Sequence, residues 1–229
     1  MDVRDNERMN PKKKLFEQFA RVAKSLASPN RLELLETLAQ GEKSVDALAQ
    51  ATGMSVANTS HHLQILRDSG LAESRKDGLQ VIYRLSDDQI PTLMGCVSRI
   101  AEKHLAEVER IVREHFDTRD SLTPVGRNEL MARVKEGGTM VIDVRPAAEY
   151  QAGHIPGAIN IPVDELPQHL DALPHAQEIV AYCRGPYCML AFEAVATLRE
   201  AGYQARRLED GFPEWKADSR PVDSGKPDS

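Results

Sequence analysis

The segment between Cys183 and Cys188 has the composition and the position of a loop that activates a thiol. It lies between an apolar, strand-like run at residues 178–182 and a helical pattern that begins at Met189. The backbone N–H groups of such a loop, together with the N-terminus of the following helix, can converge on one centre and bind an anion. The same field lowers the pKa of a cysteine thiol. Cys183 is therefore predicted to be a nucleophilic thiolate near neutral pH.

The other residues of this loop have predicted roles in binding the sulfur that Cys183 would carry. A persulfide on Cys183 ends in an anionic sulfur, which the loop N–H groups would stabilise, and Arg184 could add positive charge or hold an anionic donor. Two interpretations of Cys188 remain open. It is either a small residue whose N–H completes the loop, or a second thiol that resolves the persulfide as a disulfide or trisulfide. The remaining residues of the predicted donor-binding loop are Gly185, Pro186, Tyr187 and Met189.

Segments on both sides of this loop resemble the rhodanese family. The upstream signature D-x-R-x-x-x-E-[FY]-x-x-G-H-I-x-G-A is matched from Asp143 to Ala158. The closing signature is matched from Leu208 to Trp215, with Asp210 where a second glycine is common. The resemblance covers residues 126–220. The six-residue loop has the length found in sulfurtransferases, whereas the related phosphatases have one residue more, which argues against phosphate or arsenate ester chemistry.

The resemblance to rhodaneses implies an α/β domain with a parallel sheet and a sulfur-transfer reaction. Cys183 would attack the outer sulfur of thiosulfate or of a low-molecular-weight persulfide, and would pass that sulfur to a thiol or to cyanide. Asp143 and Arg145 would support the loop as a pair rather than take part in the chemistry, and His154 would order a turn. The alternative is a rhodanese fold that binds ligands without catalysis.

The N-terminal half has the pattern of a winged helix-turn-helix. Two short helical segments, at residues 44–53 and 55–70, are followed by a hairpin at residues 71–85 with its turn at 76–78. Outward side chains of the second helix could bind phosphates or base edges in the major groove, and cations at the hairpin tip could contact the DNA backbone or the minor groove. The predicted DNA-binding residues are Ser55, Asn58, Ser60, His61 and Gln64 on the helix, and Arg75 and Lys76 at the hairpin tip.

Residues 14–116 resemble the ArsR family of bacterial repressors. The segments Ser60–Leu63 and Leu66–Leu71 carry the resemblance. It implies a homodimer built on the first and last helices of this domain, which binds a palindromic operator in double-stranded DNA and releases it on a chemical signal. Members that sense metalloids have a cysteine pair in the helix before the recognition helix, because As(III) prefers thiolates. Residues 43–48 occupy that place here and contain no cysteine.

The last helix of this half is predicted as one continuous element from Asp88 to Phe116. Cys96 falls on its apolar side, either as a buried structural cysteine or as a sensor thiol at the dimer interface that could pair with its twin or accept a transferred sulfur. His104 and Glu107 have the i, i+3 spacing of a metal half-site, and His115 lies further along. Charged residues on a long helix are usually solvated, so we predict no metal ion and no cofactor.

Composition and charge predict the domain organisation. The chain has 229 residues, of which 41% are hydrophobic, and a net charge of −6 whose acidic excess lies in the C-terminal half. We expect a globular, cytoplasmic protein with no membrane contact, because no apolar run is long enough to span a bilayer and the N-terminus is polar. Three cysteines do not make a disulfide scaffold. The expected parts are a DNA-binding and dimerisation domain at 1–118, a linker at 119–125, a rhodanese-like domain at 126–222 and a polar tail at 223–229.

These patterns together favour a sulfur-responsive repressor. Its rhodanese-like domain would capture reactive sulfur from a small donor, and the captured sulfur, kept on the loop or delivered to a thiol acceptor, would change the hold of the dimer on DNA. The first alternative is a sulfurtransferase whose helical domain serves dimerisation or autoregulation. The second is a metalloid sensor that chelates through Cys183 and Cys188. A change in operator affinity when Cys183 is persulfidated would separate the first two.

Overall fold

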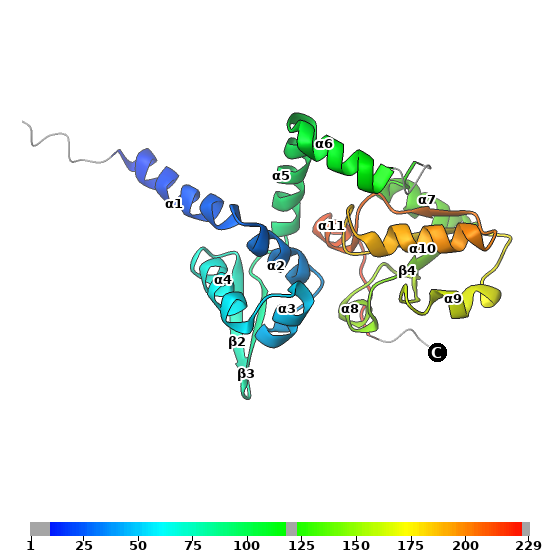
Figure 1. Ribbon diagram of the computed structural model, residues 1–229, viewed down its shortest axis with the longest axis horizontal. Helices are drawn as coiled ribbons and strands as arrows, with labels where there is room; N and C mark the ends of the chain where they lie inside the picture. The colour runs from blue at the N-terminus through cyan, green and yellow to red at the C-terminus, as the bar shows by residue number, and fades with distance from the viewer. Residues whose placement is uncertain (1–9, 118–122, 226–229) are drawn as a thin grey trace, which may run out of the picture. The chain divides into compact units, whose positions relative to one another are not determined.

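The computed structural model describes residues 10–117 and 123–225 of the chain. The chain forms two compact units, residues 1–90 and 91–229, whose elements are labelled in Figure 1. This division places residues 91–117, which the sequence assigns to the DNA-binding domain, in the second unit. Most of the predicted linker at 119–125 and the end of the predicted tail lie outside the described residues. Of the helices that are described, none combines the length and the apolar character of a membrane span.

Within residues 10–89, the first unit has four helices that begin where the sequence supplies a cap or a proline. The helices are α1 (Pro11–Leu26), α2 (Pro29–Ala39), α3 (Val45–Thr52) and α4 (Val56–Asp68). The hydroxyl of Ser44 accepts from the Ala47 N–H at 3.2 Å, and that of Ser55 accepts from the Asn58 N–H at 3.3 Å, so each serine satisfies a free backbone donor at a helix start. The core between α2, α3 and α4 is made of leucines: Leu34, Leu35, Leu38, Leu48, Leu63 and Leu66.

An antiparallel sheet completes the first unit. Its strands are β1 (Lys43–Ser44), β2 (Ala72–Asp77) and β3 (Gln80–Leu85), in the order β1-β3-β2. The predicted hairpin is confirmed, but the predicted turn at residues 76–78 is wrong. Asp77 pairs with Gln80, so the turn is Gly78-Leu79, and Gly78 has the positive φ of +58° that a glycine tolerates at the first central position of a two-residue turn. The polar residue Lys76 suits an edge strand as well as a turn, so the sequence pattern does not separate them.

The predicted single helix from Asp88 to Phe116 is also wrong. The segment forms α5 (Ile90–His104), α6 (Ala106–Val112) and the π-helical turn η2 (Arg113–Asp117). Leu105 interrupts it with φ −110° and ψ 105°, which is extended rather than helical backbone. The segment contains no glycine or proline at this point, and the apolar spacing continues across it, so nothing local marks the break.

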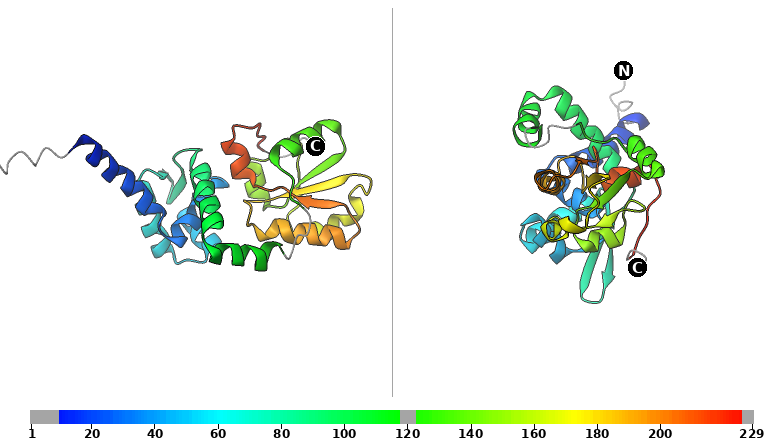
Figure 2. Two further views of the ribbon diagram at one scale, coloured as in Figure 1. Left: turned by 90° about the horizontal axis from the view of Figure 1, so that it is seen from above. Right: turned by 90° about the vertical axis from the view of Figure 1, so that its right-hand side faces the viewer.

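The remainder of the second unit is built on a four-stranded parallel sheet in the order β5-β4-β6-β7. Figure 2 shows helices on both faces of this sheet. The strands are β4 (Thr139–Asp143), β5 (Ile159–Asn160), β6 (Glu178–Tyr182) and β7 (Ala205–Arg207). The helices are α7 (Arg127–Glu136), α8 (Ala147–Ala152), α9 (Leu166–His169) with the short η3 (Leu170–Ala172), α10 (Met189–Glu200) and α11 (Phe212–Ala217).

Alternating side chains of the central strands supply the two cores of this sheet. Ile179 and Ala181 of β6 pack in one cluster with residues of α9 and α10, and Val180 and Tyr182 pack in the other with residues of α7 and α11. Asp143 lies opposite Tyr182 where β4 and β6 end, and ligands of such sheets bind at the carboxyl ends of the strands. The predicted fold class, a mainly α winged helix-turn-helix followed by an α/β unit with a parallel sheet, is confirmed.

Candidate functional site

Cys183 and Cys188 are joined by a disulfide at the carboxyl end of β6. Their Cα atoms are 6.2 Å apart. Cys183 is only 1% exposed, whereas Cys188 is half-buried and precedes α10 as its N-cap residue. The N–H of Cys188 donates to the carbonyl of Gly185 at 3.1 Å, which closes the loop. The tertiary structure therefore places both predicted thiols at the N-terminus of a twelve-residue helix.

The segment that follows β7 packs against the backbone of this loop. The Phe212 N–H donates to the carbonyl of Cys183 at 3.0 Å. A Cβ atom at Gly211 would lie 2.3 Å from the backbone nitrogen of Gly185 and 2.4 Å from the carbonyl carbon of Arg184, so no larger residue fits there. The sequence analysis missed this close approach of Gly211 to the loop, although Gly211 lies within the closing signature that carries the resemblance.

The side chain of Arg184 forms an ion pair with Glu149. Its Nε and Nη2 donate to the two carboxylate oxygens at 3.0 and 2.7 Å. Glu149, on α8, is 5% exposed. The positive charge of Arg184 is therefore shared with a buried carboxylate. Sequence reasoning gave Glu149 no role, although it occupies the glutamate position of the upstream signature.

Asp143 and Arg145 form a buried ion pair beside the loop. Neither side chain is exposed, and Nη2 of Arg145 lies 2.6 Å from the Asp143 carboxylate. Arg145 also donates to the carbonyl of Gly153 at 2.7 Å and lies over the Phe212 ring, 4.4 Å from its centroid. Burial and then the Asp143 carboxylate raise the pKa of Tyr182 well above its ordinary value, so this phenol remains protonated. Removing one partner of such a buried ion pair lowers the free energy of unfolding by about 3–5 kcal/mol.

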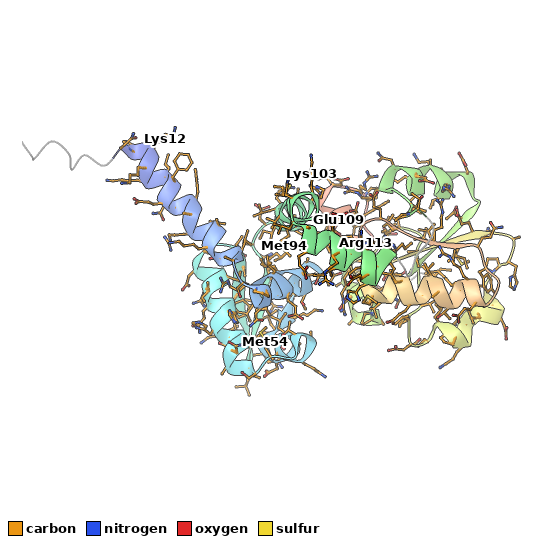
Figure 3. All side chains as sticks on the ribbon, turned by 45° about the horizontal axis from the view of Figure 1, so that its top comes forward. Lys12, Met54, Met94, Lys103, Glu109 and Arg113 are labelled. Carbon is orange, nitrogen blue, oxygen red and sulfur yellow. A yellow bond between two sulfur atoms is a disulfide. The ribbon has the colours of Figure 1, made fainter. Side chains whose placement is uncertain are left out.

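In the first unit, α4 presents a polar face. Asn58, His61 and Gln64 are exposed at steps of three residues, which places them along one side of the helix. Ser60 is half-buried, and the Ser55 hydroxyl is used as the helix cap. The Asn58 amide also donates to the sulfur of Met54, which is labelled in Figure 3, at 3.6 Å. His62, which the sequence analysis left out of the interface, lies 3.3 Å from the Asn30 amide, and burial and then the charge of Arg31 lower its pKa.

The two predicted cations of the hairpin differ in their surroundings. Arg75 pairs with Glu42 at 2.6 Å and with Asp77 at 2.9 Å, and the hydrogen bonds to these carboxylates, that to Glu42 first, raise its pKa. Lys76 is exposed on β2. Because the turn itself is Gly78-Leu79, both cations lie within the strand, and the predicted position at the very tip is wrong.

Both halves of the chain match families of known proteins. Residues 28–74 match the family described as bacterial regulatory protein, arsR family, and residues 127–218 match the rhodanese-like domain. The HTH-type transcriptional regulator Rv0324 of Mycobacterium tuberculosis is 45% identical over 214 residues, which cover 93% of each chain. The chain is an ArsR-family transcriptional regulator with a rhodanese-like domain.

Two further comparisons concern the N-terminal part of this ArsR-family regulator. The biofilm growth-associated repressor of Xylella fastidiosa is 33% identical over 99 residues, which are 43% of this chain and 87% of that protein. The solution structure of a homodimeric winged helix-turn-helix DNA-binding domain from Mycobacterium bovis is 41% identical, with a TM-score of 0.40, over 43% of this chain and 91% of that one.

Cys96 of the ArsR-family regulator is exposed, so the interpretation as a buried cysteine is wrong for the single chain. Its sulfur lies 3.2 Å from a guanidinium nitrogen of Arg99. The apolar neighbours Leu93, Val97 and Ile100 are also exposed. The apolar stripe of the sequence is real, but α5 turns it outward instead of into the core of its own unit.

The half-site for a metal in this regulator is not assembled as one helical motif. His104 ends α5 and Glu107 lies in α6, beyond the break at Leu105. Arg110 holds Glu107 at 2.6 Å, and its hydrogen bond lowers the pKa of the Glu107 carboxyl. Within residues 10–117 and 123–225, no group of three or more His, Cys, Asp or Glu side chains is arranged to hold a metal ion.

Tyr187 extends from the cysteine loop of the regulator to α5 and η2 of the same unit. Its hydroxyl donates to the Glu102 carboxylate. Its ring lies 5.3 Å from that of Phe116, edge to face, and Phe116 lies 5.4 Å from Phe192 of α10. Burial and then the hydrogen bond to Glu102 raise the pKa of Tyr187. Sequence reasoning listed Tyr187 as a loop residue only, and no local signal links it to Glu102.

Proposed function

We propose that this transcriptional regulator is a sulfur-responsive repressor whose Cys183 carries sulfur as a persulfide. The observation that supports this proposal most strongly is the position of Cys183 at the end of β6, in a loop that closes on the N-terminus of α10 and is held from behind by Gly211. An anionic terminal sulfur on Cys183 would be stabilised there by backbone N–H groups and by the helix dipole.

The proposed capture of sulfur requires the two thiols in their reduced form. The Cys183 thiolate forms a bond to the outer sulfur of thiosulfate, the S–S bond of thiosulfate breaks, and sulfite leaves with the electron pair. A low-molecular-weight persulfide would react in the same way and release its thiolate. In this proposal Arg184 and the pair Asp143–Arg145 maintain the shape of the loop. The Arg184 guanidinium is already paired with the Glu149 carboxylate, and that of Arg145 with the Asp143 carboxylate.

The proposed DNA interface is the polar face of α4 with the hairpin β2–β3. Asn58, His61 and Gln64 would reach base edges in the groove. Ser55 and Ser60 would bind phosphates near the start of α4. Lys76 and Arg75 would contact the DNA backbone beside the groove. The proposed assembly is a homodimer on a palindromic operator. Its support is the exposed apolar side chains of two helices, which a partner could cover: Leu15, Phe16 and Phe19 on α1, and Leu93, Val97 and Ile100 on α5.

The test compares operator affinity of the reduced and the persulfidated protein. A duplex is first selected from random sequences by the reduced full-length chain, and its dissociation constant is then measured by fluorescence anisotropy before and after treatment with thiosulfate. Wild-type protein treated with thiosulfate is expected to bind at least about tenfold more weakly, which corresponds to about 1.4 kcal/mol. Cys183→Ser, whose hydroxyl is not ionised near neutral pH, is expected to bind equally in both conditions.

Three outcomes have different consequences. If the affinity of wild-type protein does not change although mass spectrometry shows that its loop thiols have reacted with the donor, the switch fails and a sulfurtransferase with an accessory DNA-binding domain becomes the better interpretation. If Cys183→Ser responds like wild type, Cys183 is not the sensing thiol. If arsenite rather than a sulfur donor releases the duplex, the regulator senses metalloids through its two loop thiols.

A further inference from the structure

We propose that Cys188 resolves the Cys183 persulfide, releasing the captured sulfur as hydrosulfide and leaving a disulfide that a dithiol reductant must reset. This inference rests on the proposed function, because it needs a persulfide on Cys183. The two sulfur atoms are already bonded in the structure, with the loop closed and Gly211 behind it. The loop backbone therefore already has a conformation that allows the bond between the two cysteine sulfurs.

Geometry favours an intramolecular attack over an external one. The Cα separation of 6.2 Å lies within the range of ordinary disulfides. Cys183 is 1% exposed, and the Cys188 sulfur is within bonding reach of the Cys183 sulfur. A nucleophile held in place in this manner reacts as if it were present at very high concentration. The Cys188 sulfur also lies at the N-terminus of α10, which favours the thiolate.

The proposed step balances without an added oxidant. The Cys188 thiolate attacks the inner sulfur of the persulfide, a bond forms between the two cysteine sulfurs, and the bond to the outer sulfur breaks. The outer sulfur leaves with the electron pair and takes up a proton. The sulfane sulfur is thus reduced to hydrosulfide while the two cysteine thiols are oxidised to the disulfide.

The disulfide state then defines the class of partner that restores the regulator. In this proposal its two electrons come from a dithiol, either a small molecule or a protein with a paired-cysteine site, whose second thiol resolves the mixed disulfide. Because Cys188 is the more exposed of the two residues, the reductant would attack the Cys188 sulfur and release Cys183 as the leaving thiolate. The loop would cycle through dithiol, persulfide and disulfide.

The experiment follows sulfur and mass on the full-length protein. Reduced wild-type, Cys188→Ser and Cys96→Ser proteins, freed of reductant, receive thiosulfate, and sulfide release, intact mass and free thiols are recorded over time. Wild type and Cys96→Ser are expected to release one hydrosulfide per chain, to lose two hydrogen atoms and to stop until a dithiol is added. Cys188→Ser is expected to keep one extra sulfur atom and to release sulfide at least about a hundredfold more slowly.

The site of the product can be mapped directly. Trypsin cuts between Arg184 and Gly185, so a disulfide between Cys183 and Cys188 holds together two peptides, residues 136–184 and 185–199, under non-reducing conditions. Cys188→Ala serves as a second variant, and circular dichroism of both variants shows whether the fold is kept.

Several results would overturn the inference. Sulfide release by both Cys188 variants at the wild-type rate would exclude Cys188 as the resolving thiol. A wild-type protein that keeps its extra sulfur like Cys188→Ser, or that forms a trisulfide without releasing sulfide, would do the same while leaving the persulfide function intact. If none of the proteins gains or releases sulfur, the proposed function itself fails, which is a different result.

Discussion

The guanidinium of Arg184 donates to both carboxylate oxygens of Glu149, and Glu149 is itself buried. A two-point pair with a buried partner is held more firmly than an ion pair in solvent. In the proposed site, the field at Cys183 would therefore depend mainly on backbone N–H groups and on the N-terminus of α10. At the scale of single residues, the shape of the loop then matters more than the side-chain charge beside it, and Gly211 is the residue that limits this shape.

Gly211→Ala tests that dependence. The added Cβ would meet the backbone of Arg184 and Gly185 at 2.3–2.4 Å, so the loop must move away. We expect the rate of sulfur transfer from thiosulfate to fall about a hundredfold, since a displacement of about 1 Å at a reacting centre has that effect. The free energy of unfolding should fall by about 1–3 kcal/mol. Turnover is measured against the folded fraction from denaturant titration.

Gly126→Ala is the matched control. A Cβ atom at Gly126 would meet only the Glu209 carboxylate, at an ordinary 3.8 Å, and its φ of −71° suits any residue. This variant should keep wild-type transfer. If Gly211→Ala transfers sulfur as well as Gly126→Ala does, the closing segment does not set the loop.

At the scale of elements, α4 combines two faces with different tasks. Thr59, Leu63 and Leu66 are buried and fix the helix on the leucine core, which leaves the opposite face with its polar residues exposed. The hairpin β2–β3 adds cations of two kinds. Arg75 is paired with Glu42 and Asp77, whereas Lys76 is exposed on the edge strand. A DNA phosphate would have to compete with two carboxylates for Arg75.

Substitutions on these two elements should have different effects on DNA binding. Asn58→Ala and His61→Ala should each weaken binding to the selected duplex by about 1–3 kcal/mol for a lost base contact, with little effect on unrelated duplexes. Lys76→Ala should weaken binding to both kinds of duplex. It should also reduce the slope of the logarithm of the binding constant against the logarithm of the salt concentration by about one. Anisotropy titrations at several salt concentrations measure all three. Equal losses on selected and unrelated duplexes for Asn58→Ala and His61→Ala would exclude α4 as the base-reading helix.

At the scale of the whole molecule, the proposed switch requires that a signal from the cysteine loop reach the elements proposed for dimerisation and DNA binding. Within residues 91–229, Tyr187 bonds to Glu102 of α5 and packs against Phe116 of η2. The same helix α5 carries the exposed apolar residues proposed for dimerisation. Tyr187 is next to Cys188 in the chain, so we expect a chemical change between Cys183 and Cys188 to alter its contacts and thereby favour one arrangement of α5 over another.

Tyr187→Phe tests this route because it removes the hydroxyl and keeps the ring against Phe116. Sulfur capture should be retained, since the loop backbone is unchanged. The ratio of operator affinities between reduced and thiosulfate-treated protein should shrink by about two- to tenfold, as expected for one hydrogen bond that is present in only one state. Glu102→Gln, which weakens the same bond from the other side, should have the same effect. An unchanged ratio in both variants would show that the signal travels by another route.

The sequence by itself determined the parts of this protein that depend on neighbours along the chain. The serine caps of α3 and α4, the alternation of strands and helices, and the position of Cys183 between a strand and a helix follow from local propensity and spacing, and the family resemblances rest on such segments. The two families and the place of Cys183 in the fold could therefore be predicted, and its reactivity remains a prediction.

Only the tertiary structure decided which side chains meet. Glu149 takes up the charge of Arg184 because α8 and the end of β6 come together in the folded sheet, and Gly211 lies behind the loop because β7 runs beside β6. The break at Leu105 and the outward apolar face of α5 likewise depend on what surrounds the helix. Each of these contacts joins residues that are distant in sequence or responds to packing, and periodicity carries no information about such partners.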